Sequence, residues 1–315
     1  MIKVSGLTKY YGSKKAIEDI SFELEDGKIY GFLGPNGAGK STTMNIMTGY
    51  IGATSGTVEI NGYDILDEPE KAKKNIGYLP EIPPLYPDMT VEEYLLFAAE
   101  LKSVPRKERK AHVREIEEKT GISEVRGRLI KYLSKGYRQR VGFAQALVSY
   151  PDVIILDEPT VGLDPIQLNE MRDLIRSLRE KHTVILSSHI MQEVNAVCDT
   201  ILIINDGRLV ANDSTDNLTV SNAASSVLNY RFKSDEKTVR EILSSFNYVK
   251  INNLSEENGS VVCELETTLD ADKLQNDIFF AFADKKIVIL ESRVMTKSLE
   301  DIFIDYTNSS DGGKE

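Results

Sequence analysis

The 315-residue sequence has no tryptophan, only two cysteines and no long hydrophobic run. Its longest apolar stretches, such as 153–156 and 287–290, fall far below the roughly 20 residues that cross a bilayer. Cys198 and Cys263 belong to no pair-spaced motif, which argues against a structural disulfide or a zinc site. The N-terminal residues lack the basic, apolar and small-residue pattern of an export signal. We therefore expect a cytoplasmic protein without a membrane span.

Basic residues are also in deficit, with 38 Lys and Arg against 49 Asp and Glu and a formal net charge of -11. This charge opposes a general role in nucleic-acid binding, because phosphate backbones favour basic surfaces. Residues 132–140, "YLSKGYRQR", are a local basic exception that fits a polyanion patch, a solvated helix end or part of an active site. Hydrophobic residues at 41% and charged residues at 28% are typical of a globular protein, and the length allows two domains.

Apolar runs alternate with helical patterns over the first part of the chain, which indicates an α/β domain. Several runs are continuous, as expected for strands that are buried on both faces. The expected strands span 28–34, 56–62, 75–80, 152–159, 183–189 and 200–207. The expected helices cover 90–102, 108–121 and 165–181. Residues 90–150 contain no strand candidate, so we interpret them as a helical subdomain beside the sheet.

A polar stretch of small residues at 212–226 indicates a domain boundary near residue 220. The patterns that follow predict the order β-α-β-β-α-β and one further helix, which matches a ferredoxin-like α+β arrangement. The strands are expected at 227–233, 248–254, 260–266 and 286–292, and the helices at 236–246, 270–285 and 298–307. We therefore expect domains at 1–220 and 221–308, followed by a flexible tail at 309–315.

The segment "GPNGAGKS", Gly34 to Ser41, has the spacing of a phosphate-binding loop. Glycines at these positions let successive backbone N–H groups turn toward phosphate oxygens, while Lys40 reaches the terminal phosphates and Ser41 can bind magnesium. A chance glycine turn is the alternative, but the motif follows an apolar strand and opens a helical sequence whose positive end favours an anion. The expected nucleotide contacts are Gly34, Asn36, Gly37, Ala38, Gly39, Lys40, Ser41 and Thr42.

Two further motifs carry acidic and imidazole side chains at strand ends. Asp157 and Glu158 end an apolar strand at the edge where α/β sheets bind ligands, so we expect Asp157 to hold magnesium and Glu158 to orient or polarise water. Solvated strand-end acids are the alternative. His189 ends the next strand, and after the two preceding motifs a γ-phosphate contact is favoured over a polar surface role. His112 and His182 lie in charged helical sequence and are expected at the surface.

The order of these motifs resembles that of the nucleotide-binding subunit of an ATP-binding cassette (ABC) transporter, over roughly residues 2–215. "LSKGYRQR" resembles the family signature, which implies that Ser134 and Gly136 contact the γ-phosphate held by a second cassette in a head-to-tail dimer. The sequence before the loop looks like the family's opening hairpin, where Tyr11 stacks on adenine; a half-buried strand aromatic is the alternative. "IGYLPE" resembles the loop that usually carries glutamine, which implies that Glu81 is an oxygen ligand for magnesium.

Other features are similar to those of bacterial ABC-2 type exporters. They are Glu81, the signature variants Lys135 and Tyr137, the C-terminal domain and the "SLEDIF" ending. The loop "VGLD", 161–164, looks like the family's dimer-crossing loop, with valine where serine is common.

The resemblance implies a P-loop ABC ATPase that uses ATP and Mg2+, with Glu158, His189 and Lys40 in catalysis. It also implies a second nucleotide-binding domain as partner, in a homodimer or heterodimer, and a separate integral-membrane permease that docks at the helical subdomain and the Glu81 loop. The protein would then lie on the inner face of the cell membrane, power export and bind no nucleic acid.

Two alternatives to a transport subunit remain. The main one is a soluble ABC ATPase acting in DNA repair, translation or cofactor assembly, although the chain lacks the long coiled coils, zinc hooks and second cassette of such proteins. A binding-only module is the other, and Glu158 opposes it. For the C-terminal domain, pairing with its twin, regulating closure, sensing a ligand and structural support all remain open.

Overall fold

The computed structural model describes residues 1–215, 217, 226–257, 259–267, 270–295 and 303. Contacts within the chain divide it into two compact units, with the division after Thr215. Apart from Phe303, the expected final helix at 298–307 and the expected tail at 309–315 lie outside the described residues. In the described part of the chain, no helix combines the length and hydrophobicity that a bilayer crossing requires.

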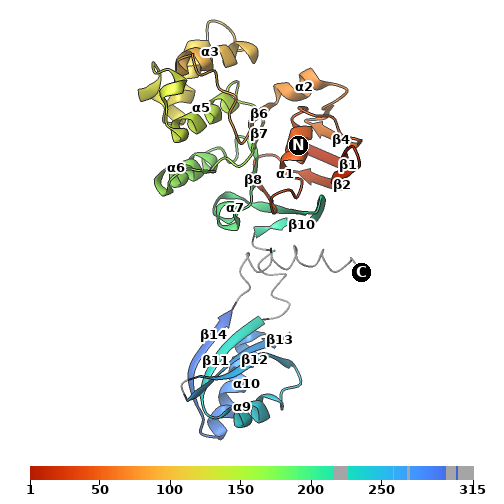
Figure 1. The fold of residues 1–315 in the computed structure, drawn as a ribbon, viewed down its shortest axis with the longest axis vertical. Coiled ribbons are helices and arrows are strands. Elements are labelled where there is room, and N and C mark those ends of the chain that lie inside the picture. Colours follow the sequence, from red (N-terminus) through yellow and green to blue (C-terminus); the bar gives the residue numbers. More distant parts are fainter. Residues whose placement is uncertain (216, 218–225, 258, 268–269, 296–302, 304–315) are drawn as a thin grey trace. The chain divides into compact units, whose positions relative to one another are not determined.

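A six-stranded sheet forms the centre of the first unit (Figure 1). Its order is β10 (Arg208–Ser214), β9 (Thr200–Asn205), β3 (Ile29–Leu33), β8 (Thr183–Ser188), β7 (Val153–Leu156) and β6 (Ile76–Leu79). All neighbours are parallel except β10, which is antiparallel to β9. Every residue of β3, β7 and β8 is buried, as their continuous apolar runs predict for strands covered on both faces.

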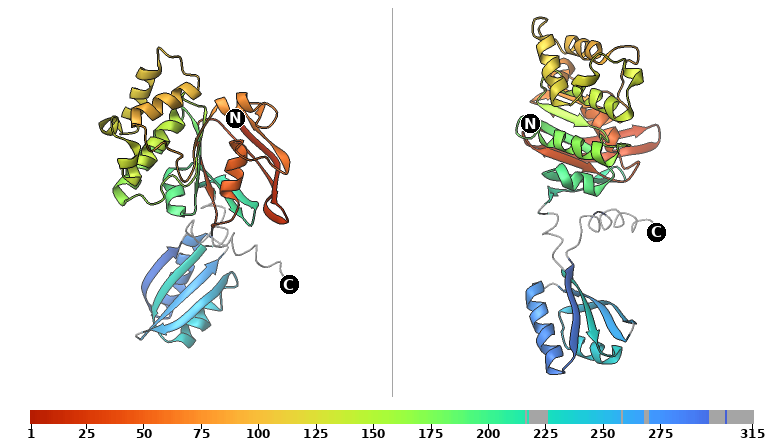
Figure 2. Two further views of the ribbon diagram at one scale, coloured as in Figure 1. Left: turned by 45° about the horizontal axis from the view of Figure 1, so that its top comes forward. Right: turned by 90° about the vertical axis from the view of Figure 1, so that its left-hand side faces the viewer.

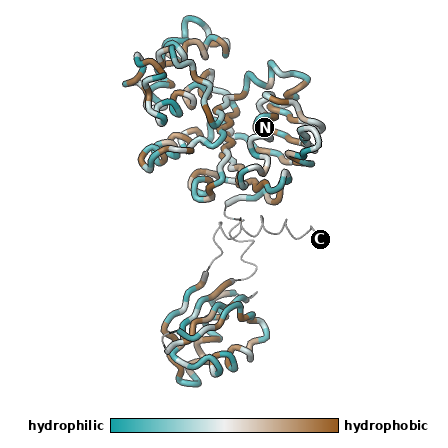
Figure 3. The backbone as a smooth tube through the Cα atoms, in the orientation of Figure 1, coloured by the Kyte–Doolittle hydropathy of each residue, from teal (hydrophilic) through white to brown (hydrophobic). Residues whose placement is uncertain are grey.

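An antiparallel sheet packs beside this parallel sheet, in the order β2 (Lys14–Leu24), β1 (Ile2–Tyr11), β4 (Ser55–Ile60) and β5 (Tyr63–Asp64). Helix α1 (Lys40–Met47) shares its core, in which Phe22 and Phe32 meet edge to face at 5.4 Å. The brown, hydrophobic parts of the tube in Figure 3 include strands of this core. Four elements were not anticipated from the sequence: β5, β10, α2 (Pro69–Lys74) and α7 (Met191–Val197).

Helices fill the region that the sequence predicts as a helical subdomain. They are α3 (Val91–Leu101), α4 (Arg109–Lys119) and α5 (Lys135–Leu147), with short 3-10 turns at Ser123–Val125 and Ile130–Tyr132. Thr90 and Glu93 form a reciprocal capping box that fixes the start of α3. Helix α6 (Pro165–Arg176) follows β7 and begins with Asp164 as its cap.

The prediction that His112 and His182 lie at the surface is wrong. His182 is buried, and its Nδ1 lies 2.7 Å from the carbonyl oxygen of Pro151. His112 is half-buried, and its Nε2 accepts a hydrogen bond of 3.0 Å from the Ser149 N–H. Burial lowers the pKa of His112, which favours the neutral ring that can accept this bond. His112 thus ties α4, and His182 the segment before β8, to neighbouring backbone.

The second unit has the predicted ferredoxin-like order. It consists of β11 (Ser226–Lys233), α9 (Glu236–Leu243), β12 (Val249–Glu257), β13 (Ser260–Thr267), α10 (Ala271–Asp284) and β14 (Val288–Met295). The sheet is antiparallel throughout, in the order β12-β13-β11-β14. Both helices cover one face of it, as Figure 2 shows, and Phe232 stacks on Phe282 at 4.0 Å in the core between them. Among the described residues, strands β12 and β14 are therefore the two edges.

Candidate functional site

The glycine-rich loop between β3 and α1 is shaped to hold an anion. Gly37 and Gly39 have positive φ angles of 85° and 110°, which non-glycine residues rarely adopt. A Cβ at Gly39 would lie 2.6 Å from Cγ2 of Ile17, whereas a Cβ at Gly37 would meet nothing within 4 Å. In the described chain no side chain caps α1, so its first N–H groups need another acceptor. The loop and helix end therefore suit a phosphate group.

Lys40 holds its ammonium group across this loop. The side chain is buried, and its Nζ donates hydrogen bonds to the carbonyl oxygens of Gly34 at 2.7 Å and Pro35 at 3.2 Å. The same Nζ lies 3.8 Å from Oε1 of Glu158. Burial lowers the pKa of Lys40, and the nearby carboxylates of Glu158 and Asp157 oppose that shift. The positive charge of Lys40 is thus partly compensated, and it can also interact with an anion that binds in the loop.

Asp157 gathers hydroxyl groups from two other elements. Its Oδ1 accepts hydrogen bonds from Ser187 Oγ at 2.6 Å and from Ser41 Oγ at 3.2 Å. Oxygen donors of this kind suit Mg2+, which also keeps waters and substrate phosphate oxygens as ligands. No cluster of three or more His, Cys, Asp or Glu side chains among the described residues is arranged to hold a metal. The donor set therefore fits a magnesium ion that arrives with a phosphate ligand.

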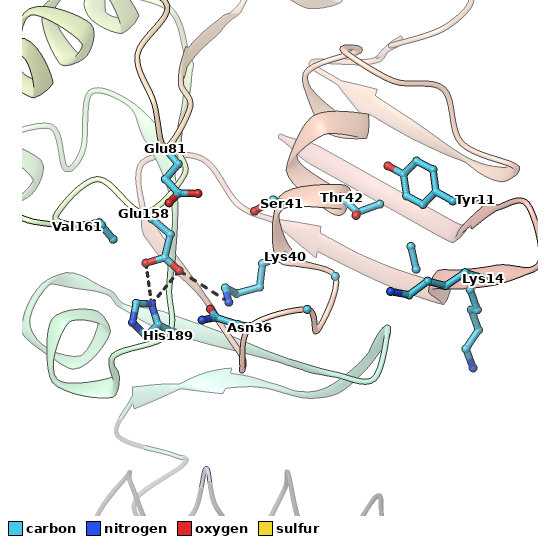
Figure 4. Close-up of a pocket in the computed structure, with 14 residues that line it drawn as sticks. Tyr11, Lys14, Asn36, Lys40, Ser41, Thr42, Glu81, Glu158, Val161 and His189 are labelled. Carbon is cyan, nitrogen blue, oxygen red and sulfur yellow. Dashed lines mark hydrogen bonds and ion pairs between the residues drawn. The ribbon is translucent and has the colours of Figure 1, made fainter.

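Glu158 and His189 meet because β7 and β8 are parallel neighbours that end at the same edge of the sheet. His189 Nδ1 lies 3.0 Å from Oε2 and 3.2 Å from Oε1 of Glu158 (Figure 4). Glu158 is 8% exposed, has a positive φ of 48°, and its N–H donates to Ser187 Oγ at 2.9 Å. Burial raises the pKa of Glu158, although the bond to His189 opposes this. The site therefore contains a buried, oriented carboxyl group of the type used as a general base.

A cavity of about 530 Å³ joins these groups. The predicted site residues that line it are Tyr11, Asn36, Gly37, Gly39, Lys40, Ser41, Thr42, Glu81, Glu158 and His189. Lys14, Lys15, Ala16 and Val161 also line it and were not predicted as site residues. Lys14 reaches the cavity because it pairs directly with Tyr11 in the hairpin of β1 and β2. The sequence signal that could have found it is the short turn that follows Tyr11.

Gly34, Ala38 and Asp157 are predicted site residues that do not line the cavity. Asp157 lies behind it and acts through Ser41. Gly34 allows close packing, since a Cβ there would lie 2.3 Å from the carbonyl oxygen of Ile204. Ala38 is buried beside it, and its N–H donates to the carbonyl oxygen of Pro35 at 3.1 Å. These three residues support the site from behind.

Ser134 and Gly136 lie at the start of α5 and also do not line this cavity. Ser134 is the exposed N-cap, and its Oγ accepts a hydrogen bond of 3.3 Å from the Tyr137 N–H. The helix begins at Lys135, directly after this cap. Within one chain, the two residues therefore contribute nothing to the site around Lys40.

The arginines of 132–140 are used inside the chain. Arg138 donates to the carbonyl oxygen of Leu133 at 2.7 Å, and Arg140 forms an ion pair with Glu170. These contacts do not favour a polyanion patch.

Glu193 on α7 is a residue that sequence reasoning missed. It is 7% exposed, and its Oε2 accepts hydrogen bonds from Thr160 Oγ1 at 2.5 Å and Ser188 Oγ at 3.0 Å. Thr160 lies in the loop after Glu158, and Ser188 directly precedes His189. Glu193 therefore connects the two segments that carry the paired carboxyl and imidazole groups. A glutamate in a short helix resembles a surface residue, so the sequence offered no signal.

We expect Glu193→Ala to lower the rate of any reaction that needs this pair, because Thr160 and Ser188 lose the acceptor that connects the segments of Glu158 and His189. Turnover should fall about tenfold, which corresponds to a rise of about 1.4 kcal/mol in the barrier, with little change in substrate KM. Glu193→Gln keeps an oxygen acceptor and should restore most of the rate. Steady-state kinetics of both variants check this. Equal loss in both, or a loss confined to KM, would exclude a positioning role.

Comparisons with known proteins give one consistent result. The family model described as "ABC transporter" matches residues 17–161. The "Linearmycin resistance ATP-binding protein LnrL" of Bacillus subtilis is 33% identical over 313 residues, which cover 98% of each chain. The "Bacitracin transport ATP-binding protein BcrA" of Bacillus licheniformis is 40% identical over 220 residues, 69% of this chain and 71% of that protein.

Solved structures agree with these relatives. "Dimeric Structure of MJ0796, a Bacterial ABC Transporter Cassette" has a TM-score of 0.63 at 27% identity and covers 68% of this chain and 98% of that chain. A second structure of MJ0796, in a dimeric post-hydrolysis state bound to ADP and Pi, has a TM-score of 0.62 at 25% identity, with the same coverage of both chains.

Proposed function

We propose that this chain powers export through a separate permease of the ABC-2 type. The premise is that it belongs to the ABC transporter family as an ATP-binding ATPase subunit. The observation that carries the proposal is the cavity that joins Lys40, Glu158 and His189 beside an anion-binding loop. Relatives named for linearmycin resistance and bacitracin transport support export over import.

ATP is the substrate that this cavity fits. We assign the phosphates to the loop N–H groups and Lys40, and the adenine to the exposed ring of Tyr11 at the other end of the cavity. When bound, Mg2+ would neutralise charge on the phosphate oxygens, held by Ser41 and Asp157 and reached by Glu81. These side chains supply oxygen donors on three different segments of the chain.

Hydrolysis requires a water molecule in line with the γ-phosphate. We assign its orientation to Glu158, whose carboxylate is buried and held by His189 at 3.0 Å. His189 is 40% exposed at its side chain and is free to reach an oxygen of the γ-phosphate from the cavity wall. Lys40 balances the negative charge that develops on the phosphates.

The second half of each ATP site is assigned to another cassette. Ser134 and Gly136 lie at the N-terminus of α5, where backbone N–H groups and the helix dipole favour an anion. The two MJ0796 structures are dimeric, which supports such an arrangement. ATP binding would then close two cassettes, and hydrolysis would release them. The partner is a second copy of this chain or a related cassette.

The permease contact is assigned to a groove of about 470 Å³ beside Glu81 in the first unit. Its lining includes Glu81, Ile82, Pro83, Ile130 and Arg138. Ile82, at 83%, is the most exposed large apolar side chain among the described residues, and it lies at the rim of this groove. Docking there would hold the chain on the inner face of the cell membrane.

Copurification tests the permease partner. The tagged chain, extracted from its own cell membranes in mild detergent, should bring down a polytopic membrane protein. Ile82→Asp should lower that yield at least about tenfold, because it places a charge in an apolar contact. Leu66→Asp, at another exposed apolar position, is the matched control and should leave the yield unchanged. Recovery only with ribosomes or nucleic acid would instead favour a soluble ABC ATPase.

A further inference from the structure

The two edges of the C-terminal sheet differ in character. On β12 the exposed side chains are all polar: Lys250, Asn252, Asn253, Glu256 and Glu257. On β14, by contrast, three large apolar side chains are exposed, Val288 at 54%, Leu290 at 51% and Val294 at 40%. Proteins normally protect free edges with charged residues, because an unprotected edge pairs with other strands. The β12 edge exposes only polar side chains, whereas β14 combines one exposed charge, Arg293, with an apolar surface that can pair.

The apolar surface continues from β14 onto the neighbouring helix. A groove of about 410 Å³ lies between α10 and β14, and its lining includes Phe279 and Leu290. Phe279 is 55% exposed and Phe280 is 64% exposed, and their rings meet edge to face at 5.4 Å. Exposed aromatic and aliphatic groups gathered at one edge are typical of a protein interface.

The sequence of β14 is self-complementary around Ser292. Glu291 and Arg293 flank it on the face opposite the helices, since they pair with Arg231 and Asn229 of β11. Ser292 and Val294 lie on the helix-covered face, since they pair with the core residues of β11. If two β14 strands meet antiparallel about Ser292, Glu291 of each faces Arg293 of the other, and the 2.9 Å ion pair that these residues form within one strand can be exchanged for one between strands. Leu290, which occupies the bulge of β14 opposite Arg231 and Phe232, then lies beside Val294, so that both charge and apolar character match across the pair.

We propose that β14 pairs antiparallel with β14 of a second copy of this chain, centred on Ser292, and that the two C-terminal sheets continue as one. Such an isologous contact has two-fold symmetry, the commonest symmetry of protein dimers. The proposal goes beyond ATP hydrolysis, and only its consequence for the two cassettes rests on the proposed function. The contact uses no ATP. It would keep two cassettes at high effective concentration after each hydrolysis event.

The first test is the oligomeric state of the full chain without nucleotide or magnesium. Sedimentation velocity should show a dimer at micromolar concentration. Leu290→Asp should raise the dissociation constant at least about tenfold, because it buries a carboxylate against Val294. Asn252→Asp, on the opposite edge, should leave the constant unchanged, and circular dichroism verifies that both variants fold. A monomeric parent chain, or equal effects of the two variants, would overturn the proposal.

The second test fixes the register. Opposed residues in antiparallel strands bring their Cβ atoms to about 4.5–5.5 Å, close enough for a disulfide after small adjustment. Ser292→Cys should therefore give a covalent dimer under mild oxidation, without nucleotide, whereas Asn252→Cys should not. The native Cys198 and Cys263 are buried and do not interfere. No crosslink at Ser292, or equal crosslinking at both positions, contradicts the register. Neither test uses ATP. A chain that does not hydrolyse ATP would therefore refute the proposed function and leave the β14 dimer unaffected.

Discussion

Glu158→Gln should abolish ATP turnover while leaving a chain that still binds ATP and forms a stable ATP-bound dimer. The amide has nearly the same shape as the carboxylate but cannot accept a proton, and the loss of a general base costs about 10²–10⁴-fold in rate. The γ-phosphate then remains in place between the two cassettes. Phosphate release measures the rate. Sedimentation with and without saturating ATP, with Leu290→Asp added to weaken the contact between β14 strands, measures the ATP-dependent dimer.

The matched control for this variant is Glu241→Gln, at an exposed glutamate on α9 of the other unit. It should leave the rate and the dimer unchanged. A Glu158→Gln chain that also carries Leu290→Asp and stays monomeric in saturating ATP, while the parent hydrolyses ATP normally, would contradict the proposed dimer of two cassettes around ATP. A variant with normal turnover would show that another group orients the water.

Lys40→Ala should weaken ATP binding as well as lower turnover. The variant loses the charged donor that spans Gly34 and Pro35 and would contact the terminal phosphates. Hydrogen bonds to charged groups contribute about 1.5–3 kcal/mol, so affinity should fall about 10–150-fold from one such bond. Further losses follow if Lys40 bridges two phosphate oxygens. Isothermal titration calorimetry with ATP measures the affinity directly.

Lys14→Ala is the control for charge alone, because Lys14 lines the same cavity but is exposed. It should weaken ATP binding far less than Lys40→Ala. Thermal unfolding of the nucleotide-free variants separates loss of binding from loss of fold. Unchanged affinity in Lys40→Ala, or an equal loss in both variants, would place the phosphates elsewhere in the cavity.

Much of the fold could be predicted from apolar runs and spaced motifs. Strands β3, β7 and β8 are continuous and fully buried, so composition alone identifies them. Strand β10 is an edge strand with exposed polar residues, and helix α7 has only seven residues, so neither carries a strong periodic signal.

The site was predictable wherever a motif holds its members a few residues apart, as in the loop around Lys40. Glu193 and Lys14 reach the site only through packing and hairpin register, which depend on contacts distant in sequence. His182 was misplaced for a related reason. Its charged neighbours indicated a surface position, but the start of β8 carries it to a buried carbonyl group.

The packing of the glycine-rich loop also bears on how this chain can evolve. A Cβ at Gly34 would collide with the backbone of β9, and one at Gly39 with Ile17, whether or not any ligand is present. Gly37 faces open space and is constrained only by its backbone angle, which asparagine can also adopt. A descendant released from selection for nucleotide binding would therefore keep Gly34 and Gly39 for the sake of folding. Position 37 would be among the first to drift, so a substitution there is an early sign of lost function in related sequences.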